Sequence, residues 1–143
     1  MSRGPVDTPY VVKVDGSAER YEPLSGDHNE GWLQDVLDKN PALIPIQALD
    51  DRVELPLVSV GREIETSAGP IDNLYVSANG YLVIAEVKLW RNPEARRKVV
   101  AQVLDYAAQV RKWSYQDLES AWKKGGPGRK ALYSDVAPPG KSE

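Results

Sequence analysis

The chain contains no cysteine and a single histidine among its 143 residues. Without cysteine there can be no disulfide, no thiolate zinc site, no iron–sulfur cluster and no thiol nucleophile. One histidine excludes a zinc site built from two histidines of this chain and disfavours a Ser-His-Asp triad. The chemistry that remains is that of carboxylates, amines, hydroxyls and amides.

Long apolar runs are also missing. No run approaches the ~18 residues of a transmembrane helix, and the first ten residues, MSRGPVDTPY, lack the apolar core of a signal peptide. Hydrophobic residues make up 41% and charged residues 27%, which is close to globular usage. We therefore expect a cytoplasmic globular chain with no membrane partner, and the lack of cysteine fits a reducing compartment.

The net charge of −3 conceals an uneven distribution. Residues 1–87 carry 6 Lys and Arg against 15 Asp and Glu, a balance of −9, whereas residues 88–130 carry 11 against 4, a balance of +7. A basic second half is typical of a surface that binds a polyanion. The alternative interpretation is a solvated helix face rich in Lys and Arg, and composition leaves both open.

Periodicity and turn residues divide the chain into three parts. We expect an N-terminal extension over 1–28 with an edge strand at 9–14, a core domain over 29–124, and a linker or disordered tail over 125–143. Within the core, the pattern predicts a helix capped by Asn29, a strand over 53–66, two strands of a hairpin, a helix opened by Asn92-Pro93 and running to about 112, and a helix over 114–124. This order predicts an α/β fold with at least three strands.

The hairpin offers two possible registers. Its strand-like runs, IDNLYVS at 71–77 and YLVIAEVKLW at 81–90, flank Ala78-Asn79-Gly80. A two-residue Asn79-Gly80 loop places Asp72 and Glu86 on opposite faces, whereas a three-residue loop with a left-handed Gly80 pairs them. The sequence permits both, and we adopt the three-residue loop because it produces a chemically sensible site.

Charged residues in this apolar hairpin indicate a cation site. Glu86 and Lys88 lie two apart on one strand and so share a face. If Asp72 joins them, two adjacent carboxylates remain ionised when a divalent cation lies between them, and oxygen ligands favour Mg²⁺ or Mn²⁺. The Val87 carbonyl could supply a third oxygen, and Lys88 could position or deprotonate a water or stabilise phosphoryl charge. The structural alternative is a surface Glu86–Lys88 pair with Asp72 capping a turn.

Four motifs together resemble the PD-(D/E)XK nuclease superfamily. GPID ends at Asp72, EVK spans 86–88, QVLDY at 102–106 resembles the Q-x3-Y motif of the RecB-like branch, and EGWLQDVLDKNPALIP from residue 30 resembles the first helix of uncharacterised bacterial members and of mismatch-endonuclease-type domains. The resemblance covers about residues 30–112. It departs from the family at Ile71, where the motif has proline, and Pro70 stands one place earlier.

The resemblance implies a restriction-endonuclease-like core, with a central mixed sheet of three to five strands flanked by helices. The usual C-terminal strand has only one weak candidate, ALYSDV at 131–136. The implied function is hydrolysis of DNA phosphodiester bonds with Mg²⁺ or Mn²⁺. The implied site residues are catalytic Asp72, Glu86 and Lys88; metal ligands Asp72, Glu86, Val87 and Glu30; supporting Gln102 and Tyr106; and nucleic-acid-binding Arg91, Arg96, Arg97 and Lys98.

Two other functions compete with this one. The first is a nuclease-like module that binds nucleic acid without cutting it. The second is a dimerising domain whose four tryptophans form a homodimer interface, since tryptophan is enriched at such interfaces.

Overall fold

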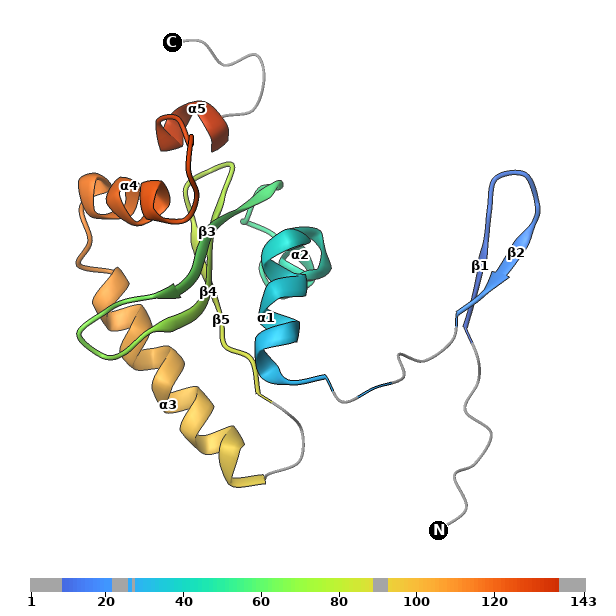
Figure 1. Cartoon of the computed structure of the whole chain (residues 1–143), viewed down its shortest axis with the longest axis horizontal. Helices are drawn as coiled ribbons and strands as arrows, with labels where there is room; N and C mark the ends of the chain where they lie inside the picture. Colours follow the sequence, from blue (N-terminus) through green and yellow to red (C-terminus); the bar gives the residue numbers. More distant parts are fainter. Residues whose placement is uncertain (1–8, 22–25, 27, 89–92, 137–143) are drawn as a thin grey trace.

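The computed structural model describes residues 9–21, 26, 28–88 and 93–136. In this part the chain is an α/β fold, with helices flanking a three-stranded sheet (Figure 1). The elements in chain order are β1 (Tyr10–Val12), β2 (Ala18–Arg20), α1 (Glu30–Lys39), the 3-10 helix η1 (Pro41–Leu43), α2 (Ile46–Leu49), β3 (Leu57–Ile64), β4 (Ile71–Ser77), β5 (Leu82–Ala85), α3 (Pro93–Val110), α4 (Tyr115–Lys124) and α5 (Leu132–Val136).

The central sheet is an antiparallel meander in the order β3-β4-β5. The expectation of a mixed sheet is therefore wrong for the described residues, because no strand follows β5 there. The strand candidate at 131–136 forms α5 instead. Leu132 and Val136 are four residues apart, which is helical spacing, and both pack against the core.

Two apolar layers enclose the sheet, and all seven residues of β4 are buried. On one side Leu74 and Val76 pack in a core that includes Tyr106 of α3 and Trp122 of α4. On the other side Tyr75 packs in a smaller cluster with Leu57 of β3, with residues of β5, and with Ile44, Ile46 and Val53 from the segment between α1 and β3. Figure 1 shows α3 and α4 on one side of the sheet and α1 and α2 on the other.

The predicted helix starts are confirmed where they are described. Asn29 caps α1, its side chain accepting a hydrogen bond from the Trp32 amide at 2.8 Å. Ser114 caps α4 through a capping box with Asp117. The predicted cap of α3 at Asn92 lies outside the described residues. That helix ends at Val110, two residues before the predicted end, where i to i+3 bonds tighten the last turn.

Both ends of the described chain differ from expectation. The edge strand expected at 9–14 is present as β1, but it pairs with a second strand, β2, that was not expected, and all strand residues of this small hairpin are exposed. The segment after Gly125, expected to be a linker or disordered tail, contributes to the core up to residue 136. The Arg129 guanidinium donates to the Val60 carbonyl at 2.6 Å and lies 4.0 Å from the Trp122 ring centre, and Leu132 is buried. Within the described residues, no helix combines the length and apolarity that crossing a membrane requires.

The turn between β4 and β5 decides the geometry of the predicted site. The strands pair Asn73 with Ala85 and Val76 with Leu82. Between them lies a three-residue loop closed by the Ser77 amide, which donates to the Tyr81 carbonyl at 2.9 Å. Gly80 is left-handed, with φ 85°. The three-residue loop is therefore confirmed. When the register is continued one residue beyond the pair of Asn73 and Ala85, Asp72 lies opposite Glu86.

We predict that Gly80→Ala lowers the free energy of unfolding by about 1–2 kcal/mol, the cost of a left-handed φ for a residue with a Cβ atom. A Cβ atom there would meet nothing within 4 Å, so the loss comes from the backbone alone. Urea unfolding measures it, and Gly80→Asn should lose less because asparagine tolerates this conformation. Gly128→Ala is the matched control. Gly128 also has a positive φ of 80° and open space for a Cβ atom, but it lies outside the hairpin. An unchanged midpoint in Gly80→Ala would contradict the assigned turn.

Candidate active site

The site lies where β4 begins and β5 has just ended. Asp72 is the second residue of β4, and Glu86, Val87 and Lys88 follow the last residue of β5. The Val87 amide donates to Asp72 Oδ2 at 2.8 Å. This bond keeps residues 86–88 against the start of β4, so the two carboxylates predicted to pair are brought together.

The ammonium of Lys88 lies among three carboxylates. Its Nζ atom is 2.8 Å from Glu86 Oε1, 3.9 Å from Asp72 Oδ2 and 3.9 Å from Glu30 Oε2. Glu30 is the first residue of α1, which reaches the same end of the sheet. The predicted convergence of Asp72, Glu86 and Lys88 is confirmed, and Glu30 joins them from a helix more than forty residues earlier in the chain.

The four side chains of the site are buried to different extents. The Glu86 side chain is 1% exposed and that of Asp72 10%, whereas Lys88 and Glu30 are 32% and 39% exposed. One carboxylate oxygen of Glu86, Oε2, is buried and has no hydrogen-bond partner among the residues that the structure describes. A buried acceptor without a partner costs about 1–3 kcal/mol, and more when it is charged. This oxygen is therefore an acceptor that the polar groups of the described residues leave unused.

The pKa values of Glu86 and Lys88 are both raised, but for different reasons. Burial raises the pKa of Glu86 and the Asp72 charge adds to this, while the hydrogen bond from Lys88 opposes it. For Lys88, burial lowers the pKa, but the hydrogen bond to Glu86 and the charges of the three carboxylates outweigh it, so the net shift is upward. Lys88 is therefore an ammonium at neutral pH.

We tested whether these residues fit a divalent cation. In the described part of the chain, no three His, Asp or Glu side chains are already placed to hold one metal ion. Two carboxylates, Asp72 and Glu86, share the Lys88 ammonium, and Glu86 Oε2 is free to coordinate. This donor set suits a hard cation such as Mg²⁺ or Mn²⁺. The Val87 carbonyl as a third ligand stays a prediction.

Gln102 and Tyr106 contact each other rather than the acidic site. Gln102 Nε2 donates to the Tyr106 hydroxyl at 2.6 Å, and the Tyr106 ring, 2% exposed, belongs to the main core. Across the described residues, neither side chain hydrogen-bonds to Asp72, Glu86 or Lys88. Their predicted supporting role stays a prediction, and of the two it is Tyr106 that packs α3 against the sheet.

Of the four predicted nucleic-acid contacts, two can be located. Arg97 and Lys98 are exposed on α3. Arg91 and the side chain of Arg96 lie outside the described residues. The four-residue connection between Lys88 and α3 is short, so the start of this basic helix cannot be far from the acidic site along the chain.

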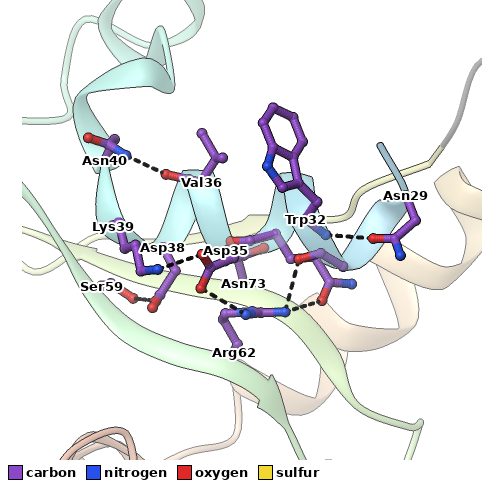
Figure 2. Close-up of polar contacts among 12 residues, drawn as sticks. Asn29, Trp32, Asp35, Val36, Asp38, Lys39, Asn40, Ser59, Arg62 and Asn73 are labelled. Atoms are coloured by element: carbon purple, nitrogen blue, oxygen red, sulfur yellow. Dashed lines mark hydrogen bonds and ion pairs between the residues drawn. The ribbon is translucent and has the colours of Figure 1, made fainter. Parts of the chain in front are cut away.

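Three polar residues that support the site were not predicted. Arg62 of β3 contacts α1, and Asn73 of β4 donates to the Gln34 carbonyl of α1 at 3.0 Å (Figure 2). Asn73 is fully buried and Gln34 is 7% exposed. A sequence signal existed for Asn73, because an amide within the apolar run IDNLYVS must find a partner when buried. No local sequence pattern identified Arg62 as a residue that contacts α1.

We predict that Glu86→Gln stabilises the metal-free protein at neutral pH. The raised pKa means that the folded state disfavours the ionised carboxylate, and a glutamine of equal size removes that cost. The melting temperature should rise by about 2–4 °C for each kcal/mol recovered. Because the folded pKa exceeds the unfolded one, the advantage should vanish below the ordinary value of 4.5 and grow as pH rises through the folded pKa.

Thermal melts at a series of pH values measure this. Glu54→Gln, at an exposed position, is the control, and a wild type more stable than Glu86→Gln at pH 7 would contradict the prediction.

Comparison with protein-family models, curated proteins and solved structures finds no match to this chain. The geometry of the site therefore carries the functional argument.

Proposed function

We propose that this chain is a metal-dependent nuclease of the PD-(D/E)XK type that hydrolyses phosphodiester bonds of DNA. The observation that carries the proposal is the meeting of Asp72, Glu86 and Lys88 at the end of the central hairpin, with a buried Glu86 oxygen left without a partner. Two acidic side chains and an ammonium at one place are what this hydrolysis requires.

The arrangement of elements supports a restriction-endonuclease-like core. A helix that carries Glu30 precedes an antiparallel meander, the last two strands of the meander bring the acidic pair together, and a long helix follows. This is the order in which the four sequence motifs occur. The described residues contain α1, three strands and the long helix α3 in this order, and no further strand after β5.

Each side chain has a distinct role in this proposal. Asp72 and Glu86 hold the metal ion, which when bound polarises the phosphate and acidifies a water. Lys88, whose pKa is raised, acts as an ammonium that orients water and offsets charge developing on the phosphate, rather than as a base. Glu30, the most exposed of the three acids, would be a further ligand for the metal ion.

The basic residues of α3 provide the DNA contact in this proposal. Arg97 and Lys98 are exposed on α3, the helix that follows Glu86 and Lys88 in the chain. Arg91 and Arg96 belong to the same basic stretch of the sequence. Contacts of this kind bind phosphates without reading bases, so affinity should fall steeply as salt rises.

We predict Mg²⁺- or Mn²⁺-dependent cleavage of plasmid or single-stranded DNA by the wild type. Lys88→Ala and Glu86→Gln should each reduce the rate by about 10²–10³-fold, the usual cost of removing one group that stabilises the transition-state charge. Lys123→Ala is the matched control, because Lys123 is 58% exposed and pairs with Glu119 on α4. Thermal melts verify that each variant is folded.

The outcomes separate the proposal from its rivals. Equal cleavage by the wild type, Lys88→Ala and Glu86→Gln would mean that a contaminant or another site cuts the DNA. DNA binding without cleavage in either metal would favour the non-catalytic module. A change in oligomeric state with protein concentration but no DNA binding would favour the dimerising domain.

We further predict that Mn²⁺ raises the melting temperature of the wild type. A ligand that binds only the folded state stabilises it by about 2.7 kcal/mol at a hundred times its Kd. Glu86→Gln, although more stable without metal, should lose this shift because its amide is a poor ligand for a hard cation. The melting temperature is compared in calcium-free buffer with and without Mn²⁺. A shift of equal size in Glu86→Gln would place the bound ion elsewhere.

A further inference from the structure

The side chain of Arg62 crosses from β3 to α1. Its guanidinium donates to three acceptors on that helix: Nη1 to Asp35 Oδ1 at 3.3 Å, and Nη2 to the Gly31 carbonyl at 3.2 Å and to Gln34 Oε1 at 3.1 Å. Figure 2 shows the Arg62 guanidinium and its hydrogen bonds below α1. The Arg62 side chain is 30% exposed, so these bonds are partly shielded from water. Such charge-assisted bonds are stronger than neutral ones.

These contacts are concentrated on the first turns of α1. Gly31 directly follows Glu30, whose carboxylate lies 3.9 Å from the Lys88 ammonium. Asn73, the neighbour of Asp72, holds the Gln34 carbonyl from the adjacent strand. The position of Glu30 over the site is therefore set by polar bonds from β3 and β4 to the backbone of the same helix.

Arginine is suited to this place in a way that lysine is not. Its planar guanidinium presents several N–H donors in a fixed fork, so one side chain reaches a carboxylate, an amide oxygen and a backbone carbonyl together. A lysine ammonium would reach fewer of these acceptors in a fixed direction. The bonds thus restrain the direction of α1 as well as its distance from the sheet.

We infer that Arg62 is a positioning residue that fixes Glu30 at the cation site through the first turn of α1. The inference rests on the proposed function, because it assigns Glu30 a place beside the cation held by Asp72 and Glu86. Arg62 acts only through the helix. Its contacts are with Gly31, Gln34 and Asp35, none of which belongs to the acidic site.

Charge and position predict opposite effects of removing Arg62. The guanidinium is a cation, so its direct field disfavours a second cation nearby, and its loss alone would tighten Mn²⁺ binding. Loss of its hold on α1 lets Glu30 move away and weakens binding. The sign of the change in Mn²⁺ affinity therefore distinguishes the two effects.

The test is a double-mutant cycle on Mn²⁺ affinity, measured by the electron paramagnetic resonance signal of free Mn²⁺. Arg62→Gln should weaken binding by about tenfold or more, as loss of a residue supporting a metal ligand usually does. Glu30→Gln should weaken it at least as much. The double variant should match Glu30→Gln within about twofold, because Arg62 acts through Glu30.

Two further variants control this experiment. Arg52→Gln removes an arginine that is 72% exposed and bonds to Asp50, away from α1, and should leave Mn²⁺ affinity unchanged. Arg62→Lys keeps the charge and part of the hydrogen bonding, and should recover part of the affinity even if Arg62→Gln is unstable. Unchanged or tighter binding in a folded Arg62→Gln, or losses that multiply in the double variant, would overturn the inference.

A metal-free measurement separates this inference from the proposed function. Amide hydrogen exchange at Trp32 and Leu33, which bond to the Asn29 cap, should accelerate in Arg62→Gln, while the Asn40 amide at the other end of α1 keeps its rate. If the wild type does not bind Mn²⁺ but this exchange changes as expected, the proposed function fails and the hold of Arg62 on the Glu30 turn stands. If the exchange rates do not change, the positioning role itself is wrong.

Discussion

The register of the β4–β5 hairpin is the constraint on which the site depends. In a strand, successive side chains alternate between faces, so a slip of one residue would turn Asp72 away from Glu86. The loop of Ala78, Asn79 and a left-handed Gly80 fixes the register that pairs them. The Val87 amide then bonds to Asp72 and extends the pairing beyond the last strand residue. One turn therefore brings a carboxylate from each strand, and the lysine two residues further on, to a common place.

Among the described residues, the site gathers more negative charge than the Lys88 ammonium balances. Three carboxylates surround Lys88, and the most buried of them, Glu86, retains an oxygen without a partner. Burial raises the pKa of Glu86, and the neighbouring charge of Asp72 adds to this increase. A fold selected for stability alone would favour a neutral group at this position. Local conflicts of this kind are typical of functional sites, where binding or catalysis compensates for the loss of stability.

The support of the site comes from both sides of the sheet. Tyr106 and Trp122 pack α3 and α4 against one face. On the other face, α1 is held by polar bonds, through Arg62 and Asn73 and through a hydrogen bond between Ser59 and Asp38. Side chains that must hold a precise geometry are better placed on such supported elements than on loops. The polar attachment of α1 also allows Glu30 to be positioned without burying it.

The sequence by itself determined the local features of this protein: the cap of α1 at Asn29, the capping box of α4, the hairpin around Asn79-Gly80, and the shared face of Glu86 and Lys88. Each depends on interactions within a few residues, which spacing and residue type reveal. The sequence allowed two hairpin loops, and only the folded chain decided between them. The tertiary structure also decided that Glu30 reaches Lys88, that Arg62 holds α1 and that Tyr106 packs in the core. These features arise from contacts between segments far apart in the chain, whose free energy depends on how whole elements pack and leaves no periodic trace in the sequence.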